Sequence, residues 1–104
     1  MEAGSLVVAH MVNPTEKFWG ILERLAPEGV TIRAINLDSF EDWLRSAARG
    51  EGQALGLSTM FLPMHRVERV FLDEQVGEVE SLAQRFEREV GFSVEEYLGR
   101  STVN

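Results

Sequence analysis

The residues best suited to chemistry or binding lie together near the middle of the chain. His65, Arg66, Glu68 and Arg69 follow closely on Pro63. An imidazole that titrates near neutral pH, beside two guanidinium groups, could hold an anion or a carboxylate. The alternative, which we favour, is that His65 bonds a backbone carbonyl at a bend and that the charged residues form local ion pairs on a solvated face.

A second histidine raises the alternative of a metal or small-ligand site. His10 is the only ionisable residue in the apolar run from Leu6 to Val12, and burial in the core is the simpler explanation for it. If the first and fifth strands pair, His10 and His65 could approach each other, and Glu68 would have to supply a third ligand. The spacing is not typical of a metal site, so we assign no metal and no cofactor.

Sequence motifs of catalysis are missing. The chain has no cysteine, no glycine-rich phosphate loop, no Gly-x-Ser-x-Gly and no His-Glu-x-x-His. Pairs of acidic residues occur only on faces expected to be solvated. We therefore expect a protein that is not an enzyme.

The aromatic residues allow two interpretations. Base-stacking platforms combine such rings with basic residues, but Trp43 has acidic neighbours, so packing is the better explanation for it. Segment 17–25 has apolar residues on both faces, and two helices carry apolar stripes. Together they present more apolar surface than one small core can bury, and we expect the excess to form an interface. Phe18 and Trp19 are the candidate interface aromatics, and a dimer or a ring is the expected assembly.

Composition limits the partners. A chain of 104 residues with a net charge of −7 disfavours binding to nucleic acid through its phosphates. No apolar run approaches the ~20 residues that cross a bilayer, and the first residues lack the basic stretch of a signal peptide. We expect a cytoplasmic protein with one domain over residues 1–104.

Five extended segments are expected to position these residues. They span 6–12, 17–25, 30–37, 57–62 and 67–72. Alternation of apolar residues predicts that segments 17–25 and 30–37 form a hairpin around Ala26 to Gly29, in which Gly29 supplies a positive φ. Pro63 marks a sharp corner between the last two strands.

Helical periodicity follows in three places. Phe40, Trp43, Leu44 and Ala47 form an apolar stripe, which predicts a helix over about 39–49 with Asp38 or Ser39 as N-cap. A second helix is predicted over about 76–90, ended by Gly91, and a third over about 94–98, capped by Ser93. The second and third helices would form an extension, residues 76–98, to a core of residues 6–72.

Several phrases of the sequence resemble a family of uncharacterised bacterial proteins. They begin at Glu16 (EKFWG), Asp38 (DSFEDW) and Phe61 (FLPMHRVER), and the resemblance covers residues 6 to about 98. It implies no known activity.

More distantly, the order of strands is similar to the five-stranded barrel of Sm-like and SH3-like proteins. This resemblance implies an α+β fold in which a small antiparallel β-barrel carries the helix 39–49 as an insertion. In that family a glycine in the second strand permits a tight bend, and Gly20 occupies that place. The resemblance also implies RNA binding as an alternative function. However, Pro63-Met64-His65 stands where RNA-binding Sm proteins carry an Arg-Gly pair, and only His65 matches the Lys-His pair of the bacterial RNA chaperone.

Overall fold

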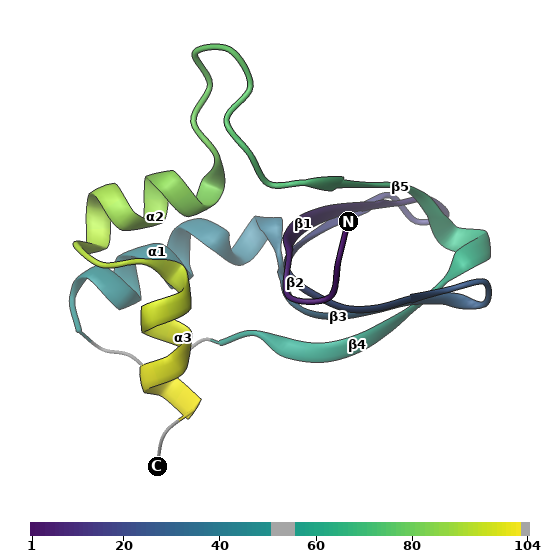
Figure 1. The fold of residues 1–104 in the computed structure, drawn as a ribbon, viewed down its shortest axis with the longest axis horizontal. Helices are drawn as coiled ribbons and strands as arrows, with labels where there is room; N and C mark the ends of the chain where they lie inside the picture. The colour runs from purple at the N-terminus through teal and green to yellow at the C-terminus, as the bar shows by residue number, and fades with distance from the viewer. Residues whose placement is uncertain (51–55, 103–104) are drawn as a thin grey trace. The chain divides into compact units, whose positions relative to one another are not determined.

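The computed structural model describes residues 1–50 and 56–102 and has an α+β fold (Figure 1). The strands are β1 (Leu6–Met11), β2 (Glu16–Ala26), β3 (Gly29–Asn36), β4 (Ser58–Pro63) and β5 (Val67–Leu72). The helices are α1 (Phe40–Ala48), α2 (Leu82–Val90) and α3 (Val94–Thr102), with 3-10 turns η1 (Leu37–Ser39) and η2 (Met64–Arg66). The chain divides into a sheet unit, residues 1–40 and 57–72, and a helical unit, residues 41–56 and 73–104.

The sheet unit is one antiparallel sheet with the strand order β4-β3-β2-β1-β5. The predicted hairpin is confirmed: β2 and β3 pair from Phe18 opposite Asn36 to Ala26 opposite Gly29. β2 lies between β1 and β3, as expected for a strand with apolar residues on both faces. A register shift between Leu22 and Arg24 then moves Leu25 onto the face of Val30.

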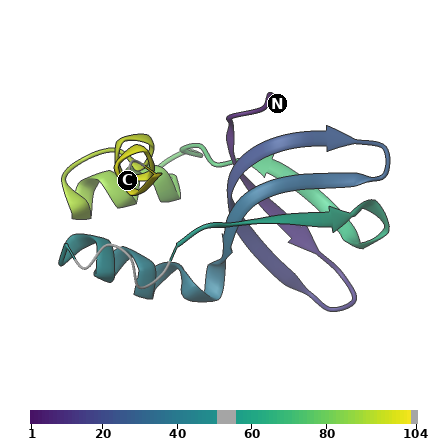
Figure 2. The same cartoon turned by 90° about the horizontal axis from the view of Figure 1, so that it is seen from below.

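The prediction of a closed barrel is wrong, because β4 and β5 remain the two edges of the sheet. In a flat sheet of five strands those edges would lie about 19 Å apart, whereas the four Cα steps across η2 span at most about 15 Å. The sheet must therefore be curled, as Figure 2 shows. A 3-10 turn rises about 2 Å per residue, so η2 separates the end of β4 from the start of β5 by roughly 8 Å. Paired strands lie about 4.8 Å apart, so β4 and β5 are too far from each other to form a ladder.

An apolar cluster fills the inside of the curl. All five strands contribute to it, including the edge residues Leu62 from β4 and Val67 and Val70 from β5. The fully buried members from β1, β2 and β3 are Val7, Ala9, Met11, Leu22, Val30, Ile32 and Ala34. Both edges thus depend on the same core, which stabilises the curl without strand pairing between them.

Two glycines allow close approach between strands. A Cβ on Gly20 would lie 2.0 Å from the carbonyl oxygen of Arg33 and 2.5 Å from the Cα of Ala34, so the close approach of β3 requires a glycine at this position. Gly29 differs from the prediction, since its φ is not positive. Its lack of a side chain instead makes room for the ring of Phe61, whose Cζ would lie 2.5 Å from a Cβ.

The helical unit is packed around aromatic rings. Trp43 of α1 stacks on Phe86 of α2 at 4.9 Å between ring centroids and meets Tyr97 of α3 edge-on at 5.7 Å. The apolar stripe predicted for the first helix is buried, which confirms that interpretation. Burial also raises the pKa of Tyr97.

The second helix begins later than predicted, at Leu82 rather than near residue 76. Ser81 is its N-cap and forms a reciprocal capping box with Gln84. The carboxylate of Asp73 also accepts hydrogen bonds from the backbone N–H groups of Leu82 (2.8 Å) and Ala83 (2.9 Å). These acceptors fix the start of the helix, since they satisfy its free N–H groups. The predicted stop at Gly91 is confirmed, with φ 101°.

The start of the first helix differs from the prediction. Asp38 and Ser39 lie in the 3-10 turn η1, which leads directly into α1 at Phe40 and is itself capped by the side chain of Asn36. The third helix runs to Thr102 rather than ending near residue 98, and the hydroxyl of Ser93 caps it as predicted.

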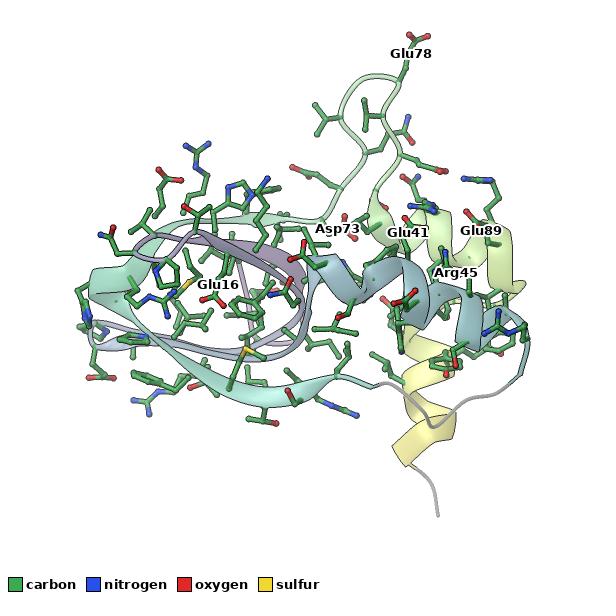
Figure 3. All side chains as sticks on the ribbon, turned by 180° about the vertical axis from the view of Figure 1, so that it is seen from behind. Glu16, Glu41, Arg45, Asp73, Glu78 and Glu89 are labelled. Carbon is green, nitrogen blue, oxygen red and sulfur yellow. The ribbon has the colours of Figure 1, made fainter. Side chains whose placement is uncertain are left out.

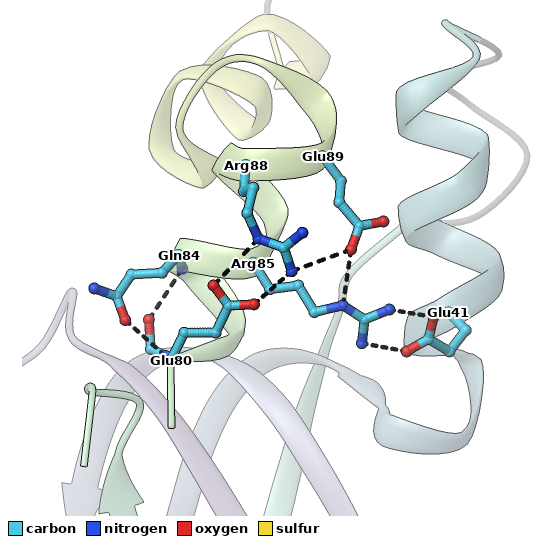
Figure 4. Close-up of polar contacts among 7 residues, drawn as sticks. Glu41, Glu80, Gln84, Arg85, Arg88 and Glu89 are labelled. Carbon is cyan, nitrogen blue, oxygen red and sulfur yellow. Dashed lines mark hydrogen bonds and ion pairs between the residues drawn. The ribbon is translucent and has the colours of Figure 1, made fainter. Parts of the chain in front are cut away.

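Ion pairs link the helices of this unit (Figure 4). The guanidinium of Arg85 on α2 binds Glu41 of α1 through two nitrogens and Glu89 of its own helix at 3.0 Å. Arg88 binds Glu80 at 2.6 Å. The hydrogen bonds from the guanidinium groups lower the pKa values of Glu41 and Glu80.

Candidate functional site: the outer face of β1, β2 and β5

The four charged candidates from the sequence do not form one site. His65 and Arg66 lie in η2, whereas Glu68 and Arg69 lie on β5. His65 is exposed. The register of β5 shifts against β1, so that Met11 faces Val67 and His10 faces Arg69, which leaves Glu68 as the bulged residue. Strand alternation alone would have given a different set of neighbours.

Arg66 has a structural role. Its Nε donates to the carbonyl of Val12 (3.1 Å), and its Nη2 donates to the carbonyl of Pro14 (3.0 Å) and to the carboxylate of Glu16 (2.6 Å). Glu16 is labelled in Figure 3. The guanidinium therefore holds the turn between β1 and β2 against η2 through its Nε and Nη2 donors.

His10 lies in the centre of a basic row that crosses three strands. Lys17 of β2 and Arg69 of β5 stand directly opposite it in the two neighbouring ladders. The ring of exposed Phe71 meets the imidazole edge-on, with 5.0 Å between centroids. We call these four residues, Lys17, His10, Arg69 and Phe71, the basic face.

The surroundings of His10 disfavour protonation of its imidazole. Partial burial, followed by the charges of Lys17 and Arg69, lowers the pKa of His10, and Glu68 opposes this only in part. Arg69 approaches Glu68 at 3.8 Å with both side chains largely exposed, so this ion pair is loose. The face therefore suits an anionic group that brings apolar surface to Phe71.

Sequence reasoning missed Lys17 and Phe71 as parts of this face. The signal that identifies Lys17 and Phe71 is the pairing and register of β2, β1 and β5, which no local pattern of the sequence gives. The same pairing places His10 opposite Arg69 rather than His65. Within residues 1–50 and 56–102, no three histidine or acidic side chains are grouped to hold a metal ion.

The two aromatics proposed for an interface lie inside the chain's own packing. Trp19 has no exposed surface and contacts Phe40 edge-on at 5.3 Å. Phe18 packs against the sheet core. The large apolar side chains that do reach the surface of the strands are Leu25, Phe61, Phe71 and Leu72, all at least 39% exposed.

A shallow groove of about 320 Å³ in the helical unit is lined by Ala83, Gln84, Glu87, Arg88, Val94 and Glu95. Its charged lining residues are Glu87, Glu95 and Arg88, and the guanidinium of Arg88 already binds Glu80.

The charge of the chain is divided unevenly. The sheet unit contains five basic and six acidic residues, whereas the helical unit contains five basic and eleven acidic ones. In the part of the chain that the structure describes, no helix is long and apolar enough to cross a membrane.

Comparisons of the chain with family models, with curated proteins and with solved structures find no match.

Proposed function

We propose that this protein is a non-catalytic, self-associating interaction module of the cytoplasm. The observation that carries the proposal is the exposure of large apolar side chains at both edges of the sheet. Phe61 is 53% exposed on edge strand β4, and Phe71 and Leu72 are 42% and 39% exposed on edge strand β5. Edge strands normally avoid such side chains, because unpaired backbone groups beside apolar surface promote association.

For the fold, we propose a relationship to the small Sm-like barrels, opened along one seam. The strand order, the short 3-10 turn between β4 and β5 and the glycine contact at Gly20 support this proposal. A relationship of this kind would also explain self-association, because a sheet with two free edges can add a neighbour at each.

The experiment that tests the proposed function is size-exclusion chromatography with light scattering, from micromolar to millimolar concentration. We expect a mass that rises above 11.7 kDa with concentration. A constant monomer mass over the whole range would refute self-association.

RNA binding is the second candidate, and one observation favours it. The basic face combines cationic groups with an exposed ring, the combination on which single-stranded bases stack. A salt-dependent shift of single-stranded RNA that is lost in Arg69→Ala would support it. Arg66→Ala is a less suitable probe, since Arg66 already holds the β1–β2 turn.

A further inference from the structure

An ordered turn of the helical unit presents apolar side chains to solvent. Val76 and Val79 bond each other through both backbone N–H groups, at 3.0 Å each, and are 68% and 71% exposed. Gln75 donates to the carbonyl of Gly77 (3.0 Å) and accepts from the amide of Gln84 on α2 (3.0 Å). The turn is thus held in place without burying its valines, which leaves them available to a partner.

The same turn is acidic. Glu74 and Glu78 are exposed on it, and Figure 3 shows Glu78 at its tip. Within residues 1–50 and 56–102 neither of these carboxylates forms an ion pair, whereas Glu80 is bound to Arg88. We call the segment from Glu74 to Val79 the acidic turn. It offers two apolar groups flanked by two negative charges.

The basic face of the sheet unit complements this turn. It offers the exposed ring of Phe71 together with the exposed side chains of Lys17 and Arg69. The ion pair of Arg69 with Glu68 is loose, at 3.8 Å. Apolar groups flanked by negative charges would meet an aromatic ring flanked by positive charges. A second exposed ring and cation, Phe61 and Arg24, lie in one row across the sheet, since both stand opposite Thr31. Acidic Glu23 and Glu28 are close to Arg24 in the sequence, so this row complements the acidic turn less well than the basic face does.

We propose that the acidic turn of one copy of this chain docks on the basic face of a second copy. The proposal rests on the self-association proposed above and assigns its surfaces. Because the two surfaces differ, the contact is head-to-tail, and each copy can bind one neighbour through its turn and another through its face. The product is a ring when the rotation closes and an open chain when it does not.

Charge reversal tests the proposal with a rescue. One variant carries Glu74→Lys and Glu78→Lys, and the other carries Lys17→Glu and Arg69→Glu. We expect each alone to remain monomeric in light scattering, since its turn and its face then have the same sign. A mixture of the two should assemble, because each turn again meets a face of opposite charge.

Controls separate this contact from general effects of charge and folding. Glu2→Lys with Glu23→Lys makes the same change of charge at exposed positions that belong to neither the acidic turn nor the basic face, and should leave assembly intact. Val76→Ser with Val79→Ser should weaken assembly without changing the charge. Circular dichroism and melting of each variant show whether it is folded, and the rescue itself requires two folded partners.

The outcomes distinguish the two proposals. If the wild type assembles and either reversal variant assembles equally well alone, the assigned surfaces are wrong and the proposed function stands. If the mixture fails to assemble, the docking is likewise refuted. A wild type that remains monomeric, including one that binds single-stranded RNA through the basic face, overturns both.

Discussion

Replacement of Gly20 by alanine should strongly destabilise the sheet unit. The added Cβ would lie 2.0 Å from the carbonyl oxygen of Arg33, and carbon–oxygen contacts of this kind normally measure at least ~3.3 Å. The obstacle is backbone, so a side-chain rotation cannot relieve it. β2 and β3 must therefore separate locally by about an ångström, which breaks one or two ladder hydrogen bonds.

The magnitude follows from those bonds. A buried backbone group left without its partner costs about 1–3 kcal/mol, so we expect a loss of roughly 3 kcal/mol in the free energy of unfolding. Native domains of this size have a total of about 5–15 kcal/mol. At about 4–8 °C per kcal/mol, the melting temperature should fall by roughly 12–24 °C.

Urea denaturation and thermal melting followed by circular dichroism measure this loss. Gly56→Ala is the matched control, because a Cβ at position 56 meets nothing within 4 Å and the backbone there has no positive φ. That control should be neutral or stabilising by up to about 1 kcal/mol. If Gly20→Ala unfolds within about 0.5 kcal/mol of the control, the close approach of β2 and β3 does not constrain the sheet.

Three further predictions concern Arg66, Asp73 and His10. Arg66→Ala should lower the free energy of unfolding, measured in urea, by about 2–3 kcal/mol, because three hydrogen bonds to the β1–β2 turn are lost. Arg69→Ala is the control and should change it by less than about 0.5 kcal/mol, because the ion pair of Arg69 with Glu68 is loose and exposed. Asp73→Ala should cost about 1–2 kcal/mol and reduce helical ellipticity, since it removes the acceptor for two N–H groups at the start of α2. Because the pKa of His10 is below 6.5 in the folded protein, the unfolded chain binds its proton more readily, so stability is complete above pH 6.5 and falls as the pH drops below it. His10→Asn should flatten the slope of stability against pH just below 6.5 in denaturation series at several pH values.

The parts of the fold set by local periodicity could be predicted from the sequence. The β2–β3 hairpin follows from alternation of apolar residues on either side of a turn, and the stripe of α1 follows from helical spacing. Gly91 and Ser93 act as helix boundaries through the chemistry of their own side chains and backbone. Each of these features depends on residues close together in the chain.

The start of α2 could also have been found, since Ser81 and Gln84 have the spacing of a capping box. The apolar residues Val76 and Val79 extend the helical pattern backwards and favour a longer helix. In the structure Val76 and Val79 form a β-bridge with each other instead, because the capping residues Ser81 and Gln84 make the helix begin at Leu82.

Contacts between distant segments could not be predicted. Arg66 meets Glu16 across fifty positions of sequence, and nothing local to either residue indicates the other. The bulge at Glu68 likewise changes which side chains share a face, and its position depends on the pairing with β1. The basic face follows from such pairing, which explains why single-residue patterns did not reveal it.

The division of the chain into two units has a consequence for dissecting the protein. The polypeptide passes from one unit to the other three times, after Phe40, before Leu57 and after Leu72. A gene truncated after Leu72 would keep every strand but would deprive Trp43 of Phe86 and Tyr97. We expect such a fragment to aggregate, because the two rings that pack on the indole of Trp43 would be missing. Isolating the sheet unit therefore requires that residues 41–56 also be replaced, by a short polar linker.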